Sequence, residues 1–310
     1  MPPRDPSLFP PLSGLTGEET EAARWVITLA LAEDVGMGDV TSQAVIPVSL
    51  HFHGVVDARH RMVVAGLPVT AEVFRMIVPE ATFTARVMDG DTVVTGTVLA
   101  ELDGPAQGLL TAERTALNLL QHLSGIATET RAYVDRIAGT RAVLLDTRKT
   151  IPGLRRLAKY ATRIGGARNH RLGLYDGVLI KDNHIAVCGS VAVAVRRARA
   201  CALSNIEVEC DSLEQVREAV EAGADIILLD NMSPFMLRQA VALVAGRART
   251  EASGGITLDS IRAVAETGVD FISVGRITHS AAAVDIGLDW HAVAHGLGPP
   301  PHPLQSFRQR

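Results

Sequence analysis

The feature that most constrains the fold is a regular alternation of short apolar segments with amphipathic helices in the second half of the chain. Six strands are predicted in succession, at residues 142–145, 177–180, 206–208, 225–229, 250–252 and 270–274. The helices predicted between the later strands each carry one apolar face and end near a glycine. Strands that alternate with helices form parallel sheets, and six units are too few for a closed eight-stranded barrel. We therefore predict an incomplete, atypical parallel α/β barrel over residues 126–284.

The first part of the chain has a different pattern of strands and helices, which predicts a second domain. Thr16 and Glu19 have the spacing of a capping box at the start of a helix. Short β-rich segments then surround one helix at residues 69–77. We predict an N-terminal α+β domain over residues 1–125, joined by residues 285–310 because the chain is expected to return to it after the barrel. The fold class is α/β.

Composition excludes several classes of protein. The chain has 310 residues, of which 47% are apolar, but it has no run of about 20 apolar residues that would span a membrane. Its first residues are rich in proline and lack the apolar core of a secretory signal, so a cytoplasmic location is predicted. The three cysteines form no CxxC pair, which argues against a disulfide framework or a zinc site.

Positive charge is concentrated in one window of the sequence. The net charge is −4, yet residues 147–175 contain eight Lys or Arg residues and no Asp or Glu. Only Tyr160 and Tyr175 are available in the window to stack on bases, so a small polyanion fits better than a nucleic acid. The chain has only three lysines, which either mark sites for a compact ammonium group or survive by codon bias: Lys149, Lys159 and Lys181.

Some of these cations follow predicted strands, where ligands of parallel sheets bind. The cations expected at this rim, as binding groups for carboxylates and phosphates, are Arg148, Lys149, His170, Arg171 and Lys181. Arg155, Arg156 and Lys159 are expected instead on the solvated face of a helix at residues 152–162. Upstream, Arg114 and its neighbour Glu113 are the only charged residues in a long stretch, so either they pair or Arg114 points into a site.

The third predicted strand brings acidic side chains to the barrel interior. Strand parity places Glu207 and Glu209 on the face opposite Ile206 and Val208. Glu209, nearer the rim, and Asp230 at the end of the next strand are predicted to hold Mg²⁺ through carboxylate oxygens. The alternative is a buried ion network with the nearby cations.

Glycines at the ends of the last strands predict a phosphate site. Ser253, Gly254 and Gly255 precede a helix expected to begin near Thr257, and Gly275 ends the following strand. Backbone amides near helix N-termini bind phosphate, although paired glycines also occur in ordinary turns.

Several longer motifs closely resemble the quinolinate phosphoribosyltransferase family. The central ones are DTRKTIPGLR at residues 146–155, GGARNHR at 165–171 and IKDNH at 180–184. The others follow the family's order: GDVTS at 38–42, ERTALN at 113–118, LSGIAT at 123–128, EVE at 207–209, LDN at 229–231, SGGI at 253–256 and THS at 278–280. The resemblance spans residues 33–289, most of the chain.

This resemblance implies a two-domain enzyme with an N-terminal α/β sandwich domain beside an incomplete barrel. It also implies assembly as a homodimer or a higher homo-oligomer with the site at the subunit interface. The implied reaction converts quinolinate and phosphoribosyl pyrophosphate to nicotinate mononucleotide, carbon dioxide and pyrophosphate, with Mg²⁺ as cofactor. No nucleic acid or membrane partner is implied.

The resemblance also implies a role for each candidate residue. The residues implied around quinolinate are Arg148, His170 and Arg171, with Arg114 supplied by a neighbouring subunit. The implied catalytic groups are Lys149 and Lys181, facing the carboxylates and pyrophosphate, and Glu209 and Asp230 on the metal and ribose side. The implied 5′-phosphate cradle consists of Ser253, Gly254, Gly255, Gly275 and His279.

Three positions depart from the residues expected of the family, namely Ile151, Arg163 and Arg276, and Arg276 would either add a phosphate contact or narrow the pocket. Two other functions compete with the implied one. One is a related phosphoribosyltransferase-like protein of molybdenum transport operons, against which the full set of cations argues. The other is a non-catalytic sensor of a phosphorylated metabolite.

Overall fold

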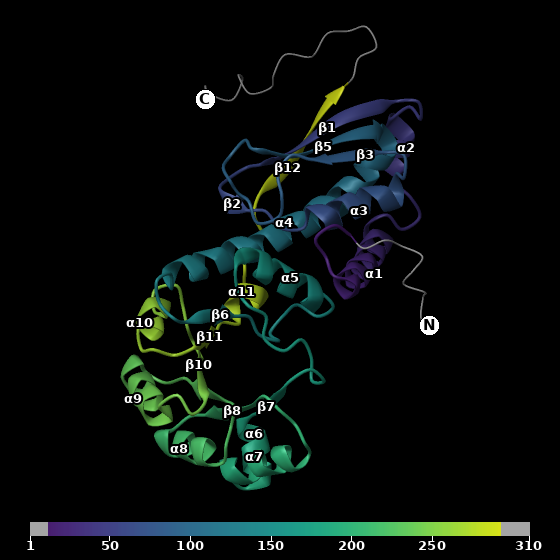
Figure 1. The fold of residues 1–310 in the computed structure, drawn as a ribbon. Helices are drawn as coiled ribbons and strands as arrows, with labels where there is room; N and C mark the ends of the chain where they lie inside the picture. The colour runs from purple at the N-terminus through teal and green to yellow at the C-terminus, as the bar shows by residue number, and fades with distance from the viewer. Residues whose placement is uncertain (1–11, 293–310) are drawn as a thin grey trace. The chain divides into compact units, whose positions relative to one another are not determined.

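The structure is a computed structural model that describes residues 12–292 (Figure 1). The predicted Pro-rich ends, and the extension of the first domain to residue 310, lie outside these residues. The described chain divides into two compact units. The first comprises residues 12–124 and 284–292, and the second comprises residues 125–283.

The first unit is built on an antiparallel sheet of four strands in the order β12-β1-β5-β3. These strands are β1 (His51–Ala58), β3 (Thr82–Ala85), β5 (Val98–Pro105) and β12 (Ile286–Ala292). β12 pairs with β1 along its length, which confirms that the chain returns to this unit after the barrel. A second, two-stranded sheet pairs β2 (Met62–Val63) with β4 (Thr92–Val93).

Four helices complete the first unit or begin in it: α1 (Gly17–Asp34), α2 (Val40–Val45), α3 (Leu67–Ile77) and α4 (Ala106–Arg136). The predicted capping box is present at α1, where the Thr16 hydroxyl accepts the Glu19 amide at 3.2 Å and the Glu19 carboxylate accepts the Thr16 amide at 2.8 Å. At α3 the Asp89 carboxylate accepts the amides of Gly66 and Leu67, so an acid distant in the sequence satisfies its first turn.

The second unit is an incomplete barrel of six parallel strands in the order β6-β11-β10-β9-β8-β7, as predicted. Its strands are β6 (Val143–Leu145), β7 (Val178–Ile180), β8 (Ile206–Cys210), β9 (Ile226–Asp230), β10 (Arg249–Ser253) and β11 (Phe271–Ser273). Each predicted strand is present within a few residues of its expected limits. β6 and β7 form the two edges, so the wall is open between them.

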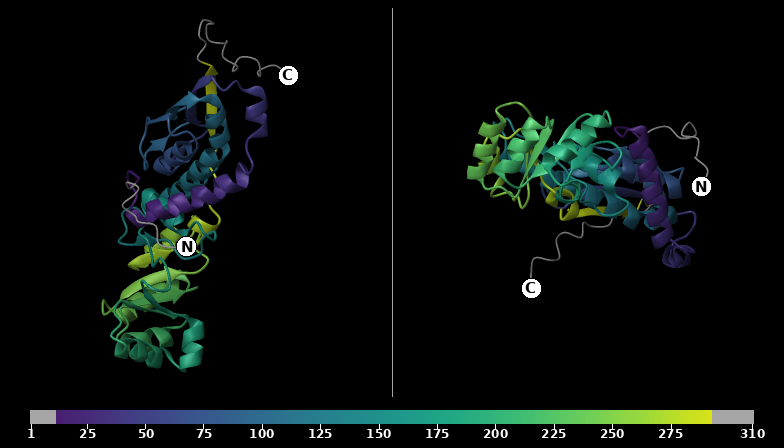
Figure 2. Two further views of the ribbon diagram at one scale, coloured as in Figure 1. Left: turned by 90° about the vertical axis from the view of Figure 1, so that its right-hand side faces the viewer. Right: turned by 90° about the horizontal axis from the view of Figure 1, so that it is seen from below.

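Helices cover the outer face of this sheet (Figures 1 and 2). They are α5 (Arg155–Gly165), α6 (Asp182–Cys188), α7 (Val191–Ala200), α8 (Leu213–Glu221), α9 (Pro234–Val244), α10 (Ile261–Ala265) and α11 (Arg276–His279). Outward side chains such as Val208, Ile227 and Leu229 pack beneath them in one buried apolar cluster. Burial of these side chains leaves the alternate residues of each strand facing the barrel interior. No helix between residues 12 and 292 is long and apolar enough to cross a bilayer, and the cytoplasmic location stays a prediction.

The segment after α5 pairs with the edge strand β6. Arg168 forms a parallel bridge with Leu145, and its amide donates to the carbonyl of Leu144 at 2.9 Å. Its own carbonyl accepts the amide of Asp146 at 3.3 Å. The chain that carries most of the basic window therefore runs along the end of β6.

Candidate active site

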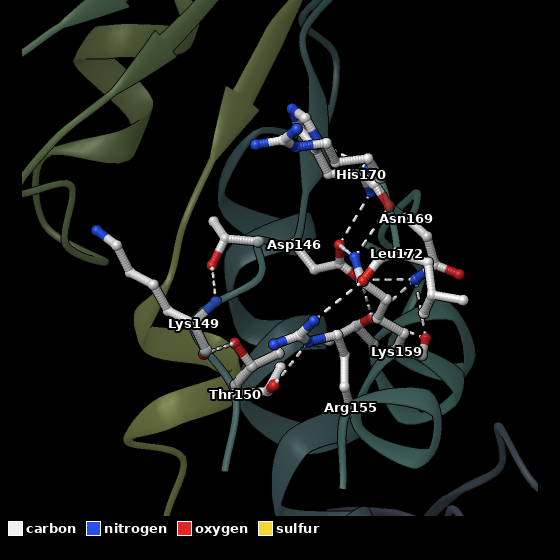
Figure 3. Close-up of polar contacts among 12 residues, drawn as sticks. Asp146, Lys149, Thr150, Arg155, Lys159, Asn169, His170 and Leu172 are labelled. Carbon is white, nitrogen blue, oxygen red and sulfur yellow. Dashed lines mark hydrogen bonds and ion pairs between the residues drawn. The ribbon is translucent and has the colours of Figure 1, made fainter. Parts of the chain in front are cut away.

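The buried carboxylate of Asp146 organises the basic window at the end of β6. It accepts hydrogen bonds from Thr162 Oγ1 at 2.9 Å, from Asn169 Nδ2 at 2.6 Å and from the amide of His170 at 2.9 Å, and it pairs with Lys159 Nζ. Lys159, Asn169 and His170 are seen around Asp146 in Figure 3. Asp146 therefore links β6, α5 and the loop that carries His170.

The prediction that Lys159 lies on a solvated helix face is wrong, because Lys159 is 3% exposed. Its neighbours Leu157, Ala158, Tyr160 and Ala161 are also buried, so α5 is covered around most of its circumference. Burial lowers the pKa of the Lys159 ammonium group, and the charge of Asp146 opposes that shift. Lys159 also donates to the carbonyl of His170 at 2.9 Å, so it is a structural cation of the site.

Arg148 and Arg171 come close enough to repel each other. Burial lowers the pKa of the Arg171 guanidinium, and the charge of Arg148 lowers it further. Arg171 Nη1 donates to the carbonyl of Gly177 at 3.1 Å, whereas Arg148 Nε is buried and has no hydrogen-bond partner among residues 12–292. Two neighbouring cations with an unsatisfied donor form a suitable site for a carboxylate ligand.

Lys149 points away from the Asp146 network (Figure 3) and lies beside Gly275 and His279. A Cβ atom at Gly275 would lie 3.0 Å from Lys149 Cδ and 3.4 Å from His279 Cδ2. The Thr278 hydroxyl donates to the Lys149 carbonyl at 2.7 Å, which fixes the backbone of the loop. Gly275 thus leaves room for the Lys149 side chain between two strand ends.

The two predicted metal ligands and the two predicted catalytic lysines act on one another. Burial raises the pKa of the Glu209 carboxyl, and the charges of Asp230 and Asp182 raise it further. Lys181 and Lys149 lower it, so both ammonium groups lie within electrostatic range of Glu209. The structure therefore gathers Lys149, Lys181, Glu209 and Asp230 at the carboxyl ends of four strands.

The Gly-Gly loop is shaped by its contact with the end of β9. Gly254 has a φ of +96°, and a Cβ atom there would lie 2.2 Å from Asn231 Oδ1. The Asn231 amide donates to the Ser253 carbonyl at 2.9 Å, and its side chain donates to Asp230 at 2.6 Å. The expected helix start near Thr257 is wrong, because α10 begins at Ile261 after a turn that uses four more residues. Of the three glycines in the predicted phosphate site, only Gly275 directly precedes a helix, the single turn α11.

Two buried acids meet inside the barrel: sequence reasoning placed Glu207 in the interior without giving it a role, and it did not select Glu251. His170 Nε2 lies 3.0 Å from Glu207 Oε2 and 3.7 Å from Glu251 Oε2. Burial and the Glu207 charge raise the pKa of Glu251 to about 8. Although burial opposes the charged imidazole, these carboxylates raise the pKa of His170. The signal was available, because strand parity places Glu251 on the same face as Ser253.

The surroundings of Arg114 and Arg276 differ from those of the cations in the basic window. Arg114 is exposed on α4 in the first unit, and its neighbour Glu113 accepts the Trp290 indole N–H at 3.3 Å. Arg276 Nε lies 3.4 Å from Glu129 Oε1, so an acid of α4 is its ion-pair partner. The structure therefore gives no support to an added phosphate contact from Arg276.

Comparisons with known proteins agree across both units. The model of the quinolinate phosphoribosyl transferase N-terminal domain matches residues 39–124, and that of the C-terminal domain matches residues 126–289. A probable nicotinate-nucleotide pyrophosphorylase [carboxylating] of Bacillus subtilis is 48% identical over 83% of this chain and 89% of its own length. The corresponding Mycobacterium leprae protein is 47% identical over 87% of this chain and 98% of its own. The crystal structure of NadC from Streptococcus pyogenes is 42% identical, with a TM-score of 0.85 over 90% of this chain and 99% of that one.

Proposed function

The chain belongs to the quinolinate phosphoribosyltransferase family, and we infer that it transfers a phosphoribosyl group to quinolinate with loss of carbon dioxide. It is therefore an enzyme, a carboxylating nicotinate-nucleotide pyrophosphorylase of NAD biosynthesis. Its substrates are quinolinate and phosphoribosyl pyrophosphate, and its products are nicotinate mononucleotide, carbon dioxide and pyrophosphate.

The observation that best supports the assignment of residues is the group of two lysines and two acids at the rim. Breaking the bond between ribose C1 and pyrophosphate builds positive charge on the sugar and negative charge on the leaving group. Lys149 and Lys181 are suited to stabilise the leaving group, and Glu209 and Asp230 the sugar. These charges are placed before the reaction begins, so little reorganisation is needed.

Arg148 and Arg171 are suited to hold the carboxylates of quinolinate. The ring nitrogen then attacks C1 as the pyrophosphate leaves with the electron pair of the broken bond. The resulting pyridinium withdraws electrons, so the carboxylate next to the nitrogen departs as carbon dioxide. Its electron pair stays on the ring carbon, which takes up a proton. The chain's own groups mainly position and polarise the substrates.

Glu209 and Asp230 fit the proposed magnesium site. They are half-buried carboxylates whose mutual repulsion raises the pKa of Glu209, and a bound cation would relieve that repulsion. Oxygen ligands of this kind suit Mg²⁺. When bound, the metal would neutralise charge on the pyrophosphate.

We also propose that the enzyme is a homodimer or a higher homo-oligomer in which Arg114 reaches the site of a neighbouring subunit. Arg114 is exposed, and no partner for it is present among residues 12–292. Trp25 and Leu29 are about half exposed on α1, at 54% and 51%. Large exposed apolar side chains of this kind support an assembly.

Release of carbon dioxide tests the reaction. Purified protein is incubated with quinolinate, phosphoribosyl pyrophosphate and Mg²⁺, and carbon dioxide and nicotinate mononucleotide are measured in equal amounts. Nicotinate in place of quinolinate should give little turnover, since the pocket has cations for two carboxylates. Tight binding of either substrate without product would favour a sensor instead.

Mixing two inactive variants tests the role of Arg114. If Arg114→Ala and Arg171→Ala subunits exchange, hybrid dimers contain one intact site, and about one quarter of wild-type activity should return. If Arg114 acts within its own subunit, no hybrid has an intact site. Mixing Arg148→Ala with Arg171→Ala is the matched control, because both residues belong to the same site and no activity should return.

A further inference from the structure

The mechanism leaves two buried acids unused. Glu207 and Glu251 are 4% and 1% exposed, and each has one oxygen, Oε1, without a hydrogen-bond partner among residues 12–292. They come from β8 and β10 and meet at the ring of His170. Ionised carboxylates without partners are costly in such a dry place, so this arrangement calls for an explanation.

The His170 ring is held at both of its nitrogen atoms. The backbone amide of Arg171 donates to Nδ1 at 2.7 Å. An amide nitrogen only donates, so Nδ1 must present a lone pair, and the ring proton must lie on Nε2. That proton points to Glu207 Oε2 at 3.0 Å. The ring therefore offers neither nitrogen to a substrate in this arrangement.

One shared proton explains the two carboxylates. Carboxylate oxygens of Glu207 and Glu251 lie within 4.8 Å of each other, and the charge of Glu207 raises the pKa of Glu251. A proton held by Glu251 and donated to Glu207 leaves Glu207 ionised as the acceptor for His170. It also removes one of the two buried negative charges. The charged groups that face this cluster from other elements are Lys159 of α5 and Arg171.

We propose that Glu251 and Glu207 are positioning residues, which hold the His170 ring so that its Nδ1 fixes the backbone of Arg171. The chain of contacts runs from Glu251 to Glu207, to His170 Nε2 and through Nδ1 to the Arg171 amide. Its benefit rests on the proposed function, since Arg171 is there a ligand for quinolinate. His170 then acts through Arg171.

The same three side chains have the composition of a metal site, because their ligand atoms lie within 4.8 Å of one another. A histidine bound to metal through Nε2 normally donates its other N–H, whereas Nδ1 of His170 accepts one. The direction of this hydrogen bond indicates that His170 Nε2 carries a proton rather than a metal ion.

Nitrogen-15 NMR of the histidine rings tests the contacts without any substrate, and His170→Asn identifies the signal. The ligand-free wild type should show a neutral Nε2–H ring, and Glu251→Gln should keep it because its amide can donate to Glu207. Glu207→Gln, which weakens the acceptor, should lose it. A protonated Nδ1 in the wild type, or a shift of the signal on adding Zn²⁺, would overturn the proposal. This result stands even if the proposed reaction is wrong.

Kinetics tests the consequence for the substrate. Glu251→Gln should keep wild-type constants, whereas Glu207→Gln and Glu251→Leu should raise KM for quinolinate about tenfold and leave KM for phosphoribosyl pyrophosphate unchanged. Glu72→Gln, another buried glutamate, in the first unit, is the matched control and should change neither constant. Equal changes in both constants for Glu207→Gln would contradict a positioning role, and that variant remains informative if Glu251→Leu does not fold.

Discussion

The barrel holds two layers of charged side chains that differ in how they are satisfied. The deep layer consists of Asp146, Lys159, His170, Glu207 and Glu251, and its members pair with one another. The rim layer consists of Arg148, Lys149, Lys181, Glu209 and Asp230, and its lysines have no ion-pair partner within hydrogen-bonding distance among residues 12–292. Acidic and basic residues therefore pair with one another in the deep layer, whereas at the rim they remain available for ligands.

Desolvation explains the difference between the layers. A buried charge loses its hydration, so it is tolerated only beside a partner of opposite charge or after taking up a proton. Charges at the rim keep part of their hydration, so they can remain unpaired until a ligand binds. Removing a deep group should therefore reduce stability, whereas removing a rim group should reduce turnover.

The largest expected effect comes from breaking the deep ion pair. Asp146→Ala leaves Lys159 buried without its acid, so the free energy of unfolding should fall by about 3–5 kcal/mol. Urea denaturation measures the change. The double variant Asp146→Leu/Lys159→Met removes both charges and should recover part of the loss. A single variant within 1 kcal/mol of wild type, on the order of a surface change, would remove the distinction between the layers.

The next effect is at the rim. Asp230→Asn should lower turnover by about 10²-fold, since a preorganised group that stabilises developing charge is weakened. The magnesium concentration needed for half-maximal activity should change, while the melting temperature should not. Asp225→Asn, at the opposite end of the barrel beside Arg199, is the matched control for activity. A wild-type response to magnesium would exclude Asp230 from the metal site.

A smaller effect is expected at the Gly-Gly loop that follows β10. Gly254→Ala forces a side chain toward Asn231 at a positive φ, so it should cost about 1–3 kcal/mol of stability. We expect KM for phosphoribosyl pyrophosphate to rise as well. Gly255→Asn is the control, because Gly255 has a positive φ but open space around its Cβ position, and asparagine tolerates that conformation. Equal costs for both variants would argue against a specific contact with Asn231.

The last effect is a change in the pH dependence of stability rather than a loss at a single pH. The pKa of Glu251 is about 8 in the folded chain, whereas the ordinary value for a glutamate carboxyl is 4.5. Between these values the folded state keeps a proton that the unfolded state releases, so the free energy of unfolding contributed by this group falls as pH rises. Glu251→Gln should flatten that part of the curve. Curves of wild type and variant that stay parallel from pH 5 to about pH 8 would contradict the shared proton.

Much of this arrangement follows from sequence pattern, and its failures have physical causes. Apolar runs located the six strands, because outward side chains must pack beneath helices. Parity placed Glu207 inside the barrel, and the same rule applied to β10 would have found Glu251. Lys159 was misplaced because its charge was given more weight than the apolar residues on either side of it. The start of α10 was missed because paired glycines do not reveal how many residues a turn uses.

The opening between β6 and β7 has a mechanical consequence. A closed barrel is held by backbone hydrogen bonds around its whole circumference. Within residues 12–292, β6 and β7 do not pair with each other, and β6 instead forms an isolated parallel bridge from Leu145 to Arg168. Lys149 follows Leu145 by four residues and Arg171 follows Arg168 by three, so both belong to the two segments that this bridge joins. Opening motions of the wall should therefore be concentrated between β6 and β7, near the residues proposed to bind the substrates. A cross-link across this opening should make the wall more rigid and slow the release of products.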